Sequence, residues 1–103
     1  MPLAGVSQIL LDVTTTAGTS QSVAVQVGSD FHWCQTDFGF QNGGTSSTIT
    51  VDLARLLSST SACEGSLPAD TSALRAIWVF FNDGGSGNGN GGVYYLDNVR
   101  TTP

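Results

Sequence analysis

The sequence predicts an all-β fold, a two-sheet antiparallel β-sandwich with jelly-roll-like wiring. Short segments alternate apolar and polar side chains with the period of a strand, turn-forming residues separate them, and only one short stretch has helical character. Spacing alone also permits immunoglobulin-like wiring, but the cysteine, tryptophan, cysteine order that marks immunoglobulin domains does not occur in the sequence. With 103 residues, the chain is expected to form one domain over residues 1–103.

The first part of the chain contains three expected strands. Residues 6–13 are mainly apolar and lead into a threonine-rich turn, as a strand that ends at a chain reversal does. Residues 22–27 place three valines on one face, and a glycine-containing turn follows them. Residues 31–38 are rich in aromatic residues and threonine, which favour strands.

The middle of the chain combines loops with one strand and the only helical candidate. Residues 39–47 are expected to form a loop, and residues 48–53 alternate again with the period of a strand. Residues 53–59 suit one or two helical turns. Residues 58–70 are rich in serine and threonine and are expected to form a long loop.

Two further strands are expected near the C-terminus. Residues 74–82 (LRAIWVFFN) carry the strongest strand signal, and residues 93–100 form the closing strand. The glycine-rich stretch between them, residues 83–92, contains a match to the dinucleotide-binding pattern G-x-G-x-x-G. That pattern must open a helix, whereas here a strand follows, so the stretch is interpreted as a hairpin loop.

Low charge limits the classes of partner. Charged residues make up 11% of the chain, the 3 basic residues are all arginine, and the net charge is −5. Binding to nucleic acid or to an anionic membrane surface requires clustered cations, so neither is an expected partner. Polyanionic polysaccharides are disfavoured for the same reason. A surface rich in Ser, Thr, Asn and Gln suits a neutral partner that carries many hydroxyl groups.

The two cysteines, Cys34 and Cys63, are either a disulfide or two buried thiols. Together with the single histidine they fall short of the four ligands of a structural zinc site. The absence of lysine from the sequence, the abundance of Ser and Thr and the glycine-rich loop are typical of extracellular proteins, which favours the disulfide. Closing this loop would stabilise the fold by about 3–4 kcal/mol on the chain-entropy model.

The sequence contains no strong motif for catalysis, and the chain is not expected to be an enzyme. A Ser–His–Asp arrangement would have to use His32, but a single histidine on a strand is more often a hydrogen-bonding residue. Glycoside hydrolysis needs two carboxylates at a defined separation. The acidic residues lie mostly at strand ends and in turns, where aspartate is a common turn and cap residue.

The aromatic residues give the most informative pattern. If Ile77 and Val79 face the core, the alternation of strand faces turns Trp78 outward. If Cys34 faces inward, Trp33 faces outward by the same alternation. The alternative is that all these aromatics are core residues. Exposed flat rings flanked by amides fit sugars, whose C–H faces stack on rings and whose hydroxyls bind polar groups. The candidate ligand-binding residues are Trp33, Trp78, Tyr95, Phe80, Gln35, Asn82 and Asp30.

Three segments carry a resemblance to a known family. Residues 48–53 (TITVDL), residues 74–82 and above all residues 92–100 (GVYYLDNVR) resemble the β-sandwich carbohydrate-binding modules of bacterial plant-cell-wall hydrolases. The resemblance implies a secreted, non-catalytic module, covalently attached to a glycoside hydrolase of endoglucanase type. It implies neutral β-glucan ligands: cellulose chains, cello-oligosaccharides, mixed-linkage β-glucan and xyloglucan. A module for mannan or xylan, and a structural or adhesive sandwich without sugar binding, remain alternatives.

The resemblance also suggests a site for a structural calcium ion. No cofactor is required for the expected function. Many such modules hold Ca²⁺ with an aspartate of the last strand, which corresponds here to Asp97. They usually have further acids in the first strand, where this chain has only Asp12 with Gln8 nearby. Calcium takes 6–8 oxygen ligands. The alternative role of Asp97 is a hydrogen bond to the adjoining loop.

Overall fold

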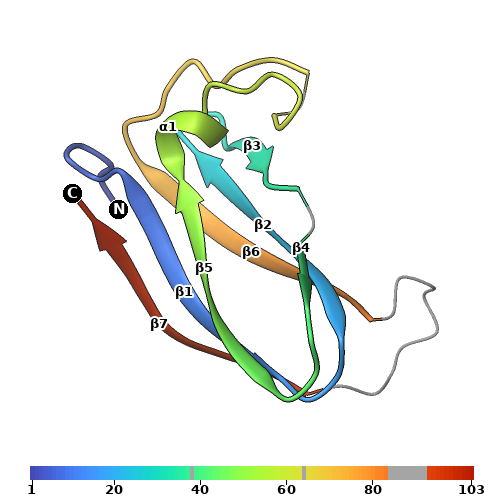
Figure 1. The fold of residues 1–103 in the computed structure, drawn as a ribbon. Coiled ribbons are helices and arrows are strands. Elements are labelled where there is room, and N and C mark those ends of the chain that lie inside the picture. Colours follow the sequence, from blue (N-terminus) through green and yellow to red (C-terminus); the bar gives the residue numbers. More distant parts are fainter. Residues whose placement is uncertain (38, 64, 84–92) are drawn as a thin grey trace.

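The computed structural model describes residues 1–37, 39–63, 65–83 and 93–103 (Figure 1). The expected glycine-rich loop lies outside the described residues, except for its first residue. The elements in chain order are β1 (Gln8–Thr15), β2 (Thr19–Val27), β3 (His32–Gln35), β4 (Gly39–Gln41), β5 (Thr45–Asp52), α1 (Leu53–Leu56), β6 (Leu74–Asp83) and β7 (Tyr94–Thr102).

The strands form two antiparallel sheets, which confirms the predicted β-sandwich. One sheet has the order β5-β1-β7. In the other sheet β2 is central, with β6 on one edge and both β3 and β4 on the other. The chain crosses between the sheets at β1–β2, β4–β5, β5–β6 and β6–β7, which is the jelly-roll-like wiring (Figure 1). No helix among the described residues is long and apolar enough to cross a membrane.

The core lies between the two central strands. In β1 every second side chain is buried, with Ile9 and Val13 fully so. In β2 the buried side chains facing them include Val23, Val25 and Val27, all 0% exposed. Burying a valine or isoleucine side chain stabilises a fold by about 1.5–3 kcal/mol. This period-two burial fixes which residues of β2 and its neighbours face outward, and so positions the candidate site.

A polar cluster explains the strand that the sequence pattern missed. The stretch 39–47, expected as a loop, contains β4 and the start of β5, and the expected strand over residues 31–38 ends at Gln35. Gln41 in β4 is 6% exposed, and its Nε2 donates to the backbone oxygens of Val13 and Thr45 at 3.0 Å. Its Oε1 accepts from Gln21 at 2.7 Å. Because the buried side chains here are amides, the apolar alternation that marks a strand is absent.

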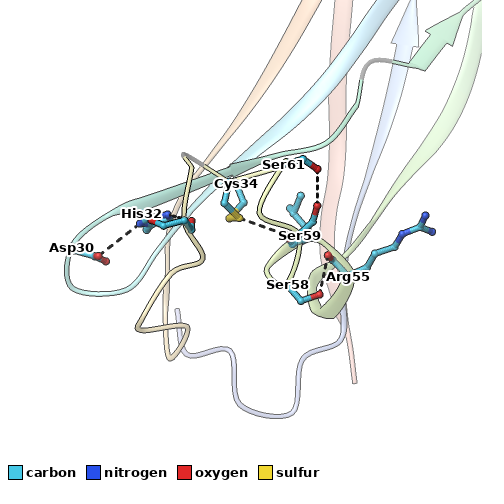
Figure 2. Close-up of a disulfide and its surroundings, with 10 residues drawn as sticks. Asp30, His32, Cys34, Arg55, Ser58, Ser59 and Ser61 are labelled. Carbon is cyan, nitrogen blue, oxygen red and sulfur yellow. Dashed lines mark hydrogen bonds and ion pairs between the residues drawn. A yellow bond between two sulfur atoms is a disulfide. The ribbon is translucent and has the colours of Figure 1, made fainter.

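The long segment between α1 and β6 is tied to the sandwich at several places. Cys34 of β3 and Cys63 form a disulfide, shown in Figure 2. Farther along, the carboxylate of Asp70 accepts hydrogen bonds from the backbone N–H groups of Ser29 and Ser72, each at 3.0 Å. The disulfide holds the segment against β3 at the edge of the four-stranded sheet, and the Asp70 bond holds it against the turn between β2 and β3.

Candidate functional site

The outer face of the four-stranded sheet carries both tryptophans. Because the three valines of β2 face the core, Ala24 and Gln26 face outward. Trp78 of β6 pairs with Ala24, and Trp33 of β3 pairs with Gln26, so the two indoles flank β2 on its outer side. Trp78 is 39% exposed and Trp33 is half-buried. This is the orientation that the alternation of strand faces predicts.

The two indoles stack on each other across β2. Their ring centroids are 4.0 Å apart and their planes are inclined by 21°. Ala24 beneath them is 0% exposed, so its small side chain leaves room for the rings to meet. One face of each indole is therefore covered by the other indole. The pair forms a single aromatic ridge. Two separate stacking platforms, one for each of two sugar rings, are not present.

A shallow cavity adjoins this ridge. It has a volume of about 300 Å³. Its lining residues come from β3, from the segment around Cys63 and from β6, and they are Trp33, Gln35, Ala62, Cys63 and Phe80. Phe80 pairs with Ser22 and is 39% exposed. The side-chain Nε2 of Gln35 donates to Ser22 Oγ at 2.9 Å, which fixes the orientation of the amide. The arrangement offers an aromatic wall and a held amide to a ligand.

Two of the sequence-predicted residues, Tyr95 and Asp30, do not join this surface, and the structure does not describe the side chain of a third, Asn82. Tyr95 pairs with Thr14 in the other sheet, where it is 59% exposed on the opposite outer face of the sandwich. Asp30 lies in the turn after β2, with its carboxylate 3.8 Å from Nδ1 of His32. Asn82 pairs with Ser20 in register with the outer face, but its side chain lies outside the described residues.

His32 makes structural contacts with Ser66 and Asp30. Its Nε2 donates to the backbone oxygen of Ser66 at 2.6 Å, and its Nδ1 faces Asp30, as Figure 2 shows for the Asp30 pair. No serine hydroxyl among the described residues bonds this imidazole. The part of the chain that the structure describes therefore contains no Ser–His–Asp constellation built on His32.

The acidic pair considered for calcium does not fit the ion. Asp12 and Asp97 are paired across β1 and β7. The carboxylate of Asp12 accepts from Thr48 Oγ1 at 2.8 Å and pairs with Arg100 Nη1 at 3.2 Å. These hydrogen bonds, that of Thr48 foremost, together with one from Asn98, hold the pKa of Asp12 below its ordinary value. A guanidinium thus already neutralises this carboxylate.

In the described residues, the hydrogen bond of Asp97 is made within β7 itself and not to the adjoining loop. Its Oδ1 accepts from the backbone N–H of Asn98 at 2.7 Å. Asn98 has φ +53° and lies at the register shift between β1 and β7, so this bond supports the β-bulge. No group of three or more His, Cys, Asp or Glu residues in the described ranges could hold a metal ion.

A second, larger cavity was not foreseen from the sequence. It has a volume of about 450 Å³ and lies beyond Gln35 and Ala62, which line both cavities. Its other residues come from the segment after β3, from β5, from α1 and from the loop that follows, and they include Asp37, Asp52, Arg55 and Ser59. Only the folded chain brings these four segments together, so no local sequence motif marks the cavity.

Comparisons of the chain with protein-family models, with curated proteins and with solved structures gave no match. The case for a function therefore rests on the surface formed by Trp33, Trp78 and Phe80 and on the two cavities beside it.

Proposed function

We propose that this domain binds neutral β-glucans without cleaving them and so directs an attached glycoside hydrolase to its substrate. The ligands proposed are cellulose chains, cello-oligosaccharides, mixed-linkage β-glucan and xyloglucan, bound on a shallow surface formed by the aromatic ridge and the adjoining cavity. The observation that carries the proposal is the stacked pair of Trp33 and Trp78 beside the hydrogen-bonded amide of Gln35. The smaller cavity next to this pair has no charged residue in its described lining.

Exposed aromatic rings on β6 supply the contact surface. Trp78 and Phe80 are each 39% exposed and lie two positions apart on one strand face. A contiguous aromatic surface of this kind commonly marks a binding site. A pyranose ring covers such a surface with its C–H groups, while its hydroxyls remain available for the amide of Gln35.

Charge favours a neutral ligand. Arg100 pairs with Asp12 on the other sheet. Arg75 donates to the backbone oxygen of Gly28 at 3.1 Å and lies over the ring of Phe31. Arg55 lines only the second cavity, together with two aspartates. A polyanion would therefore meet no cluster of free cations on this face in the described part of the chain.

The expected affinity is modest. A stacked ring contributes about 1–2 kcal/mol, since only one face is covered. One or two such contacts with a few hydrogen bonds, less the cost of ordering the ligand, give dissociation constants of about micromolar to millimolar. Such weak binding is sufficient when a covalently attached catalytic domain is held near a polymer with many sites.

Affinity electrophoresis tests the proposal. The protein should be retarded in gels that contain mixed-linkage β-glucan or xyloglucan, and Trp33→Ala should abolish the retardation. Tyr95→Ala is the matched control, because it removes an exposed aromatic from the opposite face. Retardation only by mannan or xylan would redirect the proposal to those polysaccharides. Unchanged migration in every neutral polysaccharide would contradict it and favour a structural or adhesive sandwich.

A reducing-sugar assay on the same polysaccharides tests the non-catalytic part of the proposal. The protein alone should release no reducing ends. Release that is lost on an Asp→Asn substitution would instead identify the chain as a glycoside hydrolase.

A further inference from the structure

The two cavities adjoin each other at β3 and together are termed the recess. Gln35 and Ala62 line both of them. The backbone N–H of Gln35 donates to the carbonyl of Ala62 at 2.8 Å, so the boundary between the cavities is fixed backbone. The neighbouring Cys34–Cys63 disulfide holds the same two segments together. A ligand that lies on Trp33 and Phe80 can therefore pass over this boundary into the second cavity.

We infer that the second cavity is an extension of the glycan site, in which Arg55 and Asp37 bind the hydroxyl groups of sugar units beyond the one at the aromatic ridge. This inference rests on the proposed function. It assigns the domain a ligand of several linked neutral sugars, which runs across β3 from the indole pair toward α1. It also predicts that affinity depends on the length of the oligosaccharide.

The chemistry of the second cavity suits vicinal hydroxyl groups. Arg55 offers five N–H donors in a planar fork, and the carboxylate of Asp37 offers acceptors. Both residues are exposed. Among the described residues, no hydrogen bond or ion pair uses the guanidinium of Arg55 or the carboxylate of Asp37, so both groups remain available. A sugar hydroxyl both donates and accepts, and can bridge such a pair.

The lining and charge of the cavity point to a neutral sugar. Val51 and Leu56 in its lining are 1% and 6% exposed, so they add little apolar area to a mainly polar lining. Asp37 and Asp52 outnumber the single Arg55, so an acidic sugar would meet net negative charge. A mainly polar lining of donors and acceptors suits the hydroxyl groups of a neutral sugar.

The cavity is built on fixed elements. Asp52 caps α1, because its Oδ1 accepts from the backbone N–H of Arg55 at 3.2 Å. The hydroxyls of Ser59 and Ser61 lie 3.1 Å apart and bond each other. Figure 2 shows these serines near the disulfide, with the Arg55 side chain extending away from the backbone of α1. Because the scaffold is held, the ordering cost of binding falls mainly on the free side chain of Arg55.

Isothermal titration with β-glucan oligosaccharides, from the disaccharide to the hexasaccharide, tests the inference. The unaltered protein should bind longer oligosaccharides more tightly until the recess is filled. Arg55→Ala and Asp37→Asn should leave the affinity for the shortest ligand that binds unchanged and weaken the longest about tenfold each. Arg100→Ala is the charge-matched control, because it removes the same charge from the other sheet, and it should not alter binding at any length.

Several outcomes would overturn the inference. They are an affinity that does not rise with length, equal weakening at every length in Arg55→Ala and Asp37→Asn, and no effect of either substitution on the longest ligand. If Trp33→Ala abolishes binding while both cavity variants bind normally, the proposed function stands and this inference alone is wrong. If the unaltered protein binds no oligosaccharide, both are wrong. Thermal unfolding of each variant verifies that it is folded.

Discussion

Trp33 of β3 and Trp78 of β6 stack on each other across β2, the strand that lies between β3 and β6. Their centroids lie 4.0 Å apart above Ala24, which is completely buried. An aromatic pair contributes about 0.5–1.5 kcal/mol beyond its buried area. The ridge is thus part of the fold as well as the candidate ligand surface, and its shape depends on the smallest side chain of the outer face of β2.

Ala24→Leu should break this relationship. The added carbons have no free space beneath the rings, so they will separate the indoles and lower the free energy of unfolding by about 1–3 kcal/mol. Urea unfolding measures the stability, and near-ultraviolet circular dichroism reports the loss of ring stacking. The matched control is Thr14→Leu on the outer face of the other sheet. An unaltered aromatic dichroism spectrum in Ala24→Leu would contradict the account.

Removing the disulfide should lower stability and weaken binding together. The Cys34–Cys63 bond closes a loop with a sequence separation of 29. Its loss in a Cys34→Ser, Cys63→Ser variant should reduce the free energy of unfolding by about 3–4 kcal/mol. Because Ala62 and Cys63 line the recess, glucan affinity should fall even where the variant remains folded. Equal unfolding midpoints with and without the disulfide would contradict this prediction.

Gly28 should tolerate no side chain. Its φ is +79°, and a Cβ there would overlap the carbonyl oxygen of Asp70. Gly44→Ala is the control, since Gly44 has φ +73° but nothing within 4 Å of an added Cβ. The control should lose only about 1–2 kcal/mol for its backbone conformation. Gly28→Ala should lose clearly more, as measured by chemical unfolding, and equal losses would show that the Asp70 contact is not formed.

Asp70 should make stability depend on acid pH. Hydrogen bonds from the hydroxyl and backbone N–H of Ser72, and then from the backbone N–H of Ser29, lower the pKa of Asp70 to about 2 from its ordinary 3.8. A lowered pKa favours the folded state above the unfolded value, and this stabilisation is lost as the pH falls from about 4 to about 2. The stability difference between the unaltered protein and Asp70→Asn should therefore shrink over that range.

Urea unfolding at pH 7 and near the lower end of that range measures the effect of Asp70. A difference from Asp70→Asn that stays constant with pH would contradict the assignment. Asp97→Asn serves as a control in the other sheet, where the carboxylate bonds a single backbone N–H.

The fold class and the orientation of the tryptophans could be predicted from the sequence because both depend on period-two alternation. Once Ile77, Val79 and Cys34 are assigned to the core, Trp33 and Trp78 must face outward. The contact between the rings depends on β2 lying between β3 and β6, and this long-range strand order has no local signal.

Other parts of the fold and of the candidate site could not be predicted from the sequence. Tyr95 is exposed, but β7 belongs to the other sheet, and the sequence of a strand does not say which sheet it joins. Strand β4 was missed because Gln41 and Gln21 take the buried positions that apolar residues usually mark. The second cavity depends on side chains from separate segments, such as Arg55, whose proximity exists only in the folded chain.

Intrinsic tryptophan fluorescence during titration with mixed-linkage β-glucan tests the central claim most directly. The chain has 2 tryptophans, and both are in the stacked pair, so the emission reports on the proposed site alone. The account predicts a saturable shift of the emission to shorter wavelength as a sugar displaces water from Trp33 and Trp78. It predicts the same titration curve for Tyr95→Ala. An emission spectrum that does not change up to millimolar concentrations of binding sites would contradict the account.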